Sequence, residues 1–103
     1  MSFTGHEDHS ISLQDAITMT TNYRNANRDA VKAHFFGKDA LQAILDQAGC
    51  VGIRIYYALD DQGTKHLVLC GADADENDLY DGQLAERSYP CPPYCGASSP
   101  LSE

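Results

Sequence analysis

The strongest indication of the fold lies in the residues Cys50-Val51-Gly52-Ile53-Arg54-Ile55-Tyr56-Tyr57-Ala58-Leu59, which are followed by Asp60-Asp61-Gln62-Gly63 and then by His66-Leu67-Val68-Leu69-Cys70. The first run is rich in β-branched and aromatic residues, and its alternation predicts a strand. Arg54 and Tyr56 share one face of that strand, and the opposite, expected core face holds Val51, Ile53, Ile55, Tyr57 and Leu59. The Asp-Asp-Gln-Gly run is typical of a tight turn with glycine in the left-handed region. The sequence therefore predicts an antiparallel hairpin from Cys50 to Gly71.

Two helices are predicted upstream of the hairpin. Ser12 and Asp15 resemble a capping box, and they precede an apolar face at helical spacing formed by Leu13, Ala16, Ile17 and Thr20. This pattern predicts a first helix from about Leu13 to Tyr23 or a little beyond.

The second helix is predicted from a capping box made by Asp39 and Gln42. It is followed by the apolar residues Ala40, Leu41, Ile44, Leu45 and Ala48, and Gly49 is placed at the C′ position.

The remaining elements are short. Residues 31–36 fit either a helical piece or a strand, and Gly37, which closes the segment, favours the strand. A further short strand is expected around Leu84 to Ser88. The sum is an α+β fold, with two helices packed on a small, mostly antiparallel sheet. We expect residues 11–96 to form one domain between flexible ends, residues 1–10 and 97–103.

Charge and length restrict the function. The 103-residue chain carries 15 acidic and 7 basic side chains, a formal charge of −8, which argues against nucleic acid and anionic membranes as partners. The N-terminal residues lack the basic and apolar regions of a signal peptide, and no run is long enough to span a membrane, so the expected location is the cytoplasm. A domain this small buries a modest fraction of its surface, which favours a homo-oligomer.

The segment with the most reactive side chains is Pro90-Cys91-Pro92-Pro93-Tyr94-Cys95-Gly96. Its prolines predict a stiff, non-helical loop. Cys91 and Cys95 could bind zinc or iron together with Cys50 or Cys70. They could also form a labile, redox-active disulfide, although reactive pairs usually have a shorter spacer at a helix N-terminus. The alternative for Cys50 and Cys70 is a structural one, as small apolar residues in strands.

The acidic stretch between Ala72 and Glu86 has no basic residue. Asp73, Asp75 and Asn77 match the first ligands of an EF-hand loop, but the required turn glycine and closing glutamate are missing. We interpret the stretch as a solvated loop, with a self-complementary dimer contact or a cation site as the functional alternatives.

The pattern of residues favours binding over catalysis. No phosphate-binding loop, nucleophile elbow or zinc-protease motif is present. We therefore expect a small interaction module that binds a protein partner or itself. The predicted contact residues are Arg54, Tyr56 and His66 on the hairpin and Tyr89 and Tyr94 in the tail. The alternative is a metal or iron–sulfur protein that uses the four cysteines.

Two resemblances add to this interpretation. Gly49-Cys50-Val51-Gly52-Ile53-Arg54-Ile55-Tyr56 and Cys91-Pro92-Pro93-Tyr94-Cys95 resemble a family of small bacterial proteins with a Gly-Cys-Val-x-x-Arg-Ile-Tyr strand and a Cys-Pro-Pro-x-Cys tail. That family has no assigned activity, so the resemblance implies a shared design for Arg54 and the tail and no catalytic residue. In outline, Gly49-Cys50 together with Cys91 and Cys95-Gly96 also resembles A-type iron–sulfur carriers, in which one residue separates the tail cysteines where three separate them here.

Overall fold

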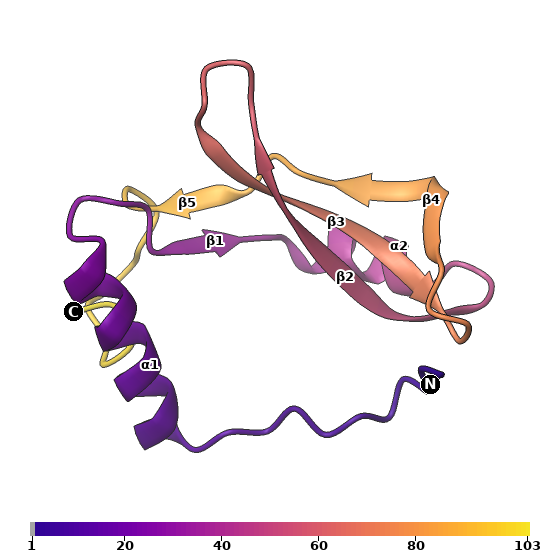
Figure 1. Ribbon diagram of the computed structural model, residues 1–103, viewed down its shortest axis with the longest axis horizontal. Helices are drawn as coiled ribbons and strands as arrows, with labels where there is room; N and C mark the ends of the chain where they lie inside the picture. Colours follow the sequence, from indigo (N-terminus) through magenta and orange to yellow (C-terminus); the bar gives the residue numbers. More distant parts are fainter. Residues whose placement is uncertain (1) are drawn as a thin grey trace. The chain divides into compact units, whose positions relative to one another are not determined.

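The computed structural model describes residues 2–103, which group into two compact units. Residues 2–7 and 36–88 form what we call the sheet unit, and Asp8–Phe35 with Tyr89–Glu103 form the tail unit. The elements along the chain are α1 (Leu13–Ala26), β1 (Ala33–Phe35), α2 (Lys38–Leu45), β2 (Cys50–Leu59), β3 (Lys65–Asp73), β4 (Asp78–Ala85) and β5 (Tyr89–Cys91), as Figure 1 shows. The α+β class predicted from the sequence is confirmed, with two antiparallel sheets, β2-β3-β4 and β1-β5.

The central hairpin forms where the sequence predicts it. β2 and β3 pair from Leu59 opposite Lys65 to Ile53 opposite Gly71, and a bulge lies between Cys50 and Gly52. At the turn, Gly63 has φ 81°, and its N–H donates to the Asp60 carbonyl at 3.0 Å. Glycine adopts this backbone conformation without steric cost, so the predicted turn is confirmed.

Helix α2 covers one face of the sheet unit and contacts all three of its strands (Figure 1). Ile44 on the helix is 1 % exposed and Leu69 on β3 is 2 % exposed. The Gln47 amide, just beyond the helix, donates to the Ile44 carbonyl at 2.9 Å and accepts the N–H of Gln83 at 2.8 Å. This one side chain therefore ties the helix end to β4.

Two glycines leave room for Gln47. A Cβ at Gly71 would lie 2.9 Å from the Cys50 sulfur and 3.0 Å from the Gln47 nitrogen, and a Cβ at Gly82 would overlap the Gln47 oxygen. The helix can approach β3 and β4 closely because both positions lack a side chain.

The predicted bounds of α2 require correction. Gly37 is the N-cap and makes no side-chain cap bond, so Asp39 lies in the first turn and is not the cap. The helix ends at Leu45, four residues before Gly49, because the side chain of Gln47 satisfies the Ile44 carbonyl. Gly49 does take a positive φ of 79°, but it turns the chain into β2.

The third strand begins earlier than predicted. β4 starts at Asp78, where the sequence suggested a solvated loop, and ends at Ala85. The reason is a tight turn after β3: the Asp73 carboxylate accepts the N–H groups of Asp75 and Asn77, each at 2.9 Å. Side-chain bonds of this kind let aspartate stabilise a turn.

In the tail unit, α1 follows the prediction closely. The Ser12 hydroxyl accepts the N–H of Asp15 at 3.0 Å, and the helix runs on to Ala26. β1 pairs with β5, which confirms the strand preference for residues 31–36. The guanidinium of Arg24 donates to the Leu101 carbonyl at 2.5 Å, and the Lys32 ammonium donates to the Ser102 carbonyl at 2.6 Å. These bonds fix the C-terminal segment within the tail unit.

Helix α2 buries only part of the apolar face of the hairpin. Ile55, Tyr57 and Leu59, which we call the apolar row, lie on the predicted core face but are 56 %, 95 % and 68 % exposed. The prediction that this whole face is buried is therefore wrong at its distal end. Within residues 2–103, neither helix has the length and apolar character that crossing a membrane requires.

We expect Gly71→Ala to destabilise the protein by about 1–3 kcal/mol, because the new methyl group must displace Cys50, Gln47 or Leu79. Urea unfolding followed by circular dichroism measures the change. Gly52→Ala is the matched control, since it lies in the same sheet and nothing lies within 4 Å of the position that its methyl group would take. Equal destabilisation by both substitutions would contradict the packing described for α2.

Candidate functional site

The three predicted contact residues of the hairpin lie on one face. Arg54 pairs with Cys70, Tyr56 with Val68, and Ala58 with His66, and residues paired across strands share a face. This face is opposite the one that contacts α2, because Gly71, which neighbours Gln47, pairs with Ile53. The structure thus brings Arg54, Tyr56 and His66 together as a row.

Arg54 and Tyr56 are held by a residue that the sequence analysis did not select. Asp78, the first residue of β4, accepts from Arg54 Nη1 at 2.5 Å, and its second oxygen accepts a short hydrogen bond from the Tyr56 hydroxyl. Arg54 also donates to the Glu76 carbonyl at 3.1 Å. We call Arg54, Tyr56 and Asp78 the polar cluster.

The polar cluster shifts the titration of its members in consistent directions. The hydrogen bond from Tyr56, followed by that from Arg54, lowers the pKa of Asp78 because both donors favour the carboxylate. The same bond raises the pKa of Tyr56, since ionisation would remove the donor and place a second negative charge beside Asp78. The bond to Asp78 likewise raises the pKa of Arg54. The cluster is thus most stable with all three groups in their ordinary charge states at neutral pH.

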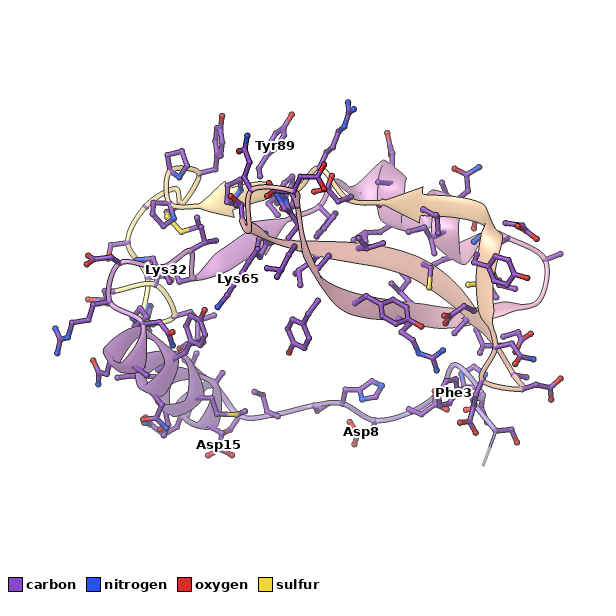
Figure 2. The ribbon with its side chains drawn as sticks, turned by 45° about the horizontal axis from the view of Figure 1, so that its top comes forward. Phe3, Asp8, Asp15, Lys32, Lys65 and Tyr89 are labelled. Carbon is purple, nitrogen blue, oxygen red and sulfur yellow. A yellow bond between two sulfur atoms is a disulfide. The ribbon has the colours of Figure 1, made fainter. Side chains whose placement is uncertain are left out.

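An N-terminal residue contacts the arginine of this cluster. The Arg54 guanidinium carbon lies 5.6 Å from the centre of the Phe3 ring, within the range of a cation–π contact. The Phe3 N–H donates to the Ala74 carbonyl at 3.0 Å and so anchors the segment beside the β3–β4 turn. Figure 2 shows Phe3 at this end of the sheet unit.

The two cysteines of the sheet unit lie on opposite faces. Cys70 is buried opposite Arg54, and burial, followed by the charge of Asp78, raises the pKa of its thiol. Cys50 approaches Gly71 on the face of α2, and its thiol contacts the Gly52 carbonyl at 3.2 Å. A buried thiol with a raised pKa is a poor nucleophile at neutral pH, so Cys70 has the character of a small apolar core residue.

His66 is engaged at the turn end of the same face. Its Nε2 atom lies 3.0 Å from Asp60 and its Nδ1 atom lies 2.8 Å from Glu86. Asp60 also accepts the N–H groups of Gln62 and Thr64, each at 2.9 Å. The Thr64 bond, with a further contribution from His66, lowers the pKa of Asp60. Both ring nitrogens of His66 are therefore engaged by carboxylates of the sheet unit.

The tail cysteines form a disulfide. Cys91 and Cys95 are joined across a Cα–Cα distance of 4.8 Å, and Cys50 and Cys70 are free. Cys91 belongs to β5 and is 6 % exposed, whereas Cys95 lies in the following loop and is half-buried. In this oxidised state neither tail sulfur can bind a metal ion as a thiolate.

Of the two predicted tail tyrosines, Tyr89 precedes this disulfide loop and Tyr94 lies within it. The Tyr89 ring centre lies 5.2 Å from that of Tyr94 and 6.3 Å from that of Phe35, with a tilt of 33° in each pair. Such distances are typical of favourable aromatic pairs. Tyr89 extends from β5 as Figure 2 shows, and it is 58 % exposed, with Tyr94 63 % exposed.

The described residues contain no ready-made cation site. Within residues 2–103, no group of three or more histidine, cysteine, aspartate or glutamate side chains is arranged to hold a metal ion. The acidic turn that resembled an EF-hand instead uses Asp73 to bind its own backbone. The arrangement presents an edge strand, exposed apolar and aromatic side chains, and one disulfide in the tail.

Sequence reasoning missed Asp78 and Phe3. Asp78 was one of several acidic residues in one stretch, and only the start of β4 places it opposite Arg54 and Tyr56. A signal did exist, because a lone arginine in an apolar strand calls for a carboxylate partner. No sequence signal pointed to Phe3, since it lies in a polar segment that was expected to be flexible.

Comparison with known proteins returns no match: no family model, no curated protein and no solved structure is similar to this chain. Membership of the small bacterial family with the Cys-Pro-Pro-x-Cys tail therefore stays a prediction.

We expect Asp78→Asn to lower the free energy of unfolding at about pH 7 and to flatten its dependence on pH. Because the folded protein lowers the pKa of Asp78 below its usual 3.8, the carboxylate contributes stability above about pH 4 and loses it as the pH falls through the folded-state pKa. Urea unfolding over that range measures both effects. Asp81→Asn, an exposed aspartate of the same strand, is the control, and an identical pH profile in the two variants would contradict the role given to Asp78.

Proposed function

We propose that the chain is a small interaction module that self-associates by pairing β2 with β2 of a second copy. One observation carries this proposal: β2 is the edge of its sheet, and the apolar row on it is left exposed. An edge strand offers a row of backbone N–H and C=O groups to another chain. A second strand would use these groups and bring its own apolar side chains beside the apolar row at the same time.

The two edges of the sheet differ in the way that this proposal requires. β2 is ten residues long and has one charged side chain, Arg54, with no proline. β4, the other edge, has Asp78 and Asp81, a central glycine and a register shift against β3. Charge and irregularity are the features that natural proteins use to block edge pairing. β4 therefore has the features of a protected edge and β2 does not.

The charge distribution favours a second copy as the occupant. The sheet unit has eleven acidic and four basic side chains, a formal charge of −7, yet β2 itself contains no acidic residue. Pairing through β2 keeps β4 and its aspartates at the two outer edges of a six-stranded sheet. A β4 contact between copies would instead bring aspartates together, at a cost in repulsion.

The apolar row is compatible with two-fold symmetry. If Tyr57 lies opposite Tyr57 of the second copy, Ile55 lies opposite Leu59 of that copy, and all six side chains share one face. A two-fold interface of this kind uses the same surface on both subunits.

The polar face has a smaller part in this proposal than the sequence suggested. Arg54 is paired with Asp78, and both ring nitrogens of His66 are bonded within the sheet unit, so these polar groups already have partners there. Tyr89 and Tyr94 remain candidate contacts for a protein partner. We place the module in the cytoplasm, where the acidic composition suits a freely diffusing protein.

We expect Tyr57→Lys to convert a dimer into a monomer. The substitution costs little in the isolated subunit because Tyr57 is 95 % exposed, but it places two lysines opposite each other in the proposed register. Light scattering after size-exclusion chromatography, over a series of protein concentrations, measures the mass.

Tyr80→Lys is the matched control, since this tyrosine is 71 % exposed on β4 and lies outside the proposed interface. A wild-type protein that is monomeric throughout the series overturns the proposal, as does a Tyr80→Lys variant that dissociates equally. A Tyr57→Lys variant that keeps its mass but unfolds more readily would assign the apolar row to a contact within one chain.

The second candidate function is metal or iron–sulfur binding by Cys91 and Cys95 with Cys50 or Cys70. The observation in its favour is that the two tail sulfurs are adjacent, so that after reduction they could bind one zinc or iron ion together. The resemblance of the tail to a Cys-Pro-Pro-x-Cys family does not identify a bound metal. The metal-binding candidate therefore rests only on the chemistry of the two sulfurs.

Native mass spectrometry on protein purified under reducing conditions tests this candidate. It predicts one added mass per chain that matches zinc or iron, lost in Cys95→Ser and retained in Ser98→Ala, a nearby serine outside the pair. An apo mass in the reduced wild type would rule it out without affecting self-association through β2.

A further inference from the structure

The two sulfurs of the tail disulfide differ in access. Cys91 is held in β5, where its backbone pairs with Ala33 and its carbonyl accepts the N–H of Lys32 at 2.8 Å. Its side chain is almost fully buried, whereas that of Cys95, past the last strand, is half-buried. A thiolate from solution can therefore approach the Cys95 sulfur more readily than the Cys91 sulfur.

The position of this disulfide suits reversible chemistry. It closes a loop with a sequence separation of 4, and closure of so short a loop removes little entropy from the unfolded chain. It also joins β5 to the loop directly after it. Disulfides in a reducing compartment, where we place this protein, are usually transient or redox-sensing.

The surroundings of the disulfide are unusual in so acidic a chain. From Tyr89 to Ser102 the sequence has no charged side chain, although the whole chain carries −8. An anionic thiol such as glutathione meets less repulsion at this segment than at the sheet unit with its charge of −7. Because this segment is uncharged, an anionic thiol, the commonest class of small cellular thiol, can approach the disulfide without strong electrostatic repulsion.

We propose that the Cys91–Cys95 disulfide is a thiol–disulfide exchange site for low-molecular-weight thiols, with Cys95 as the sulfur that is attacked. A thiolate bonds to the Cys95 sulfur, the bond to Cys91 breaks, and Cys91 leaves as a thiolate that takes up a proton. A second thiolate then attacks the mixed disulfide and releases Cys95. In total, two thiols are oxidised to one small disulfide, and the protein disulfide is reduced to two thiols.

Exchange at this site acts on the aromatic surface of the tail. Tyr94 lies inside the disulfide loop, and its N–H donates to the Pro90 carbonyl at 2.9 Å. The closed loop holds the Tyr94 ring against Tyr89. Opening the loop gives Tyr94 more freedom and weakens this pair, so the redox state of the tail controls a surface that is 58–63 % exposed at its two tyrosines. This inference does not depend on self-association through β2.

The first test uses the native protein with mixtures of reduced and oxidised glutathione. Samples are alkylated with N-ethylmaleimide at successive times, and their masses and modified peptides are determined. We expect Cys91 and Cys95 to gain one adduct each while the far-UV circular dichroism is unchanged, and to lose this reactivity when oxidised glutathione is added back. Adducts that arise only together with loss of the circular dichroism signal would show a structural disulfide and overturn the proposal.

The second test identifies the attacked sulfur. We expect Cys91→Ala, which fills a buried position with a small apolar residue, to gain one glutathione at Cys95 on exposure to oxidised glutathione. Cys95→Ala should gain none at Cys91 over the same time, and Cys50 and Cys70 are the internal references for sheet-unit thiols. Wild-type protein treated with limiting reduced glutathione gives the same assignment without substitution. A mixed disulfide found mainly at Cys91, or equally at Cys50, overturns the assignment to Cys95.

Discussion

The structure of the sheet unit depends on a mismatch of length between α2 and β2. A helix of eight residues is about 12 Å long, whereas a strand of ten residues is about 33 Å long. The helix can therefore bury the sheet only near Ile44 and Leu69, where Gly71 and Gly82 let it approach closely. The rest of the apolar face has no cover in its own unit, and the exposure of Ile55, Tyr57 and Leu59 follows directly.

The two faces of the hairpin differ in whether their side chains find partners within the sheet unit. On one face, Asp78 satisfies Arg54 and Tyr56, and Asp60 and Glu86 satisfy His66, so polar groups find their partners within the unit. On the other face, apolar side chains extend beyond the helix and have no equivalent local partner. Hydrogen bonds and ion pairs saturate at short range, but apolar surface stays available until it is covered. This difference is why we assign association to the apolar row.

The sequence predicted the elements whose signals are local. Alternation from Val51 to Leu59, the turn ending at Gly63 and the Ser12 cap each depend on neighbouring residues, and all three are present. It failed where a distant residue decides the outcome. The helix ends early because the side chain of Gln47 satisfies the Ile44 carbonyl, and β4 starts early because Asp73 closes a turn. Neither partner could be assigned from spacing alone.

The four cysteines also differ in whether neighbouring residues alone predict their arrangement. Spacing identified Cys91 and Cys95 as a pair, and a short, proline-rich spacer is enough to keep their sulfurs close. Cys50 and Cys70 could not be interpreted in this way, because their faces depend on the register and on the bulge next to Gly52. Burial and the charge of Asp78 suppress ionisation of Cys70, whereas the tail pair lies in a segment without charge. This difference in surroundings is why we propose thiol exchange at the tail pair and not at Cys70.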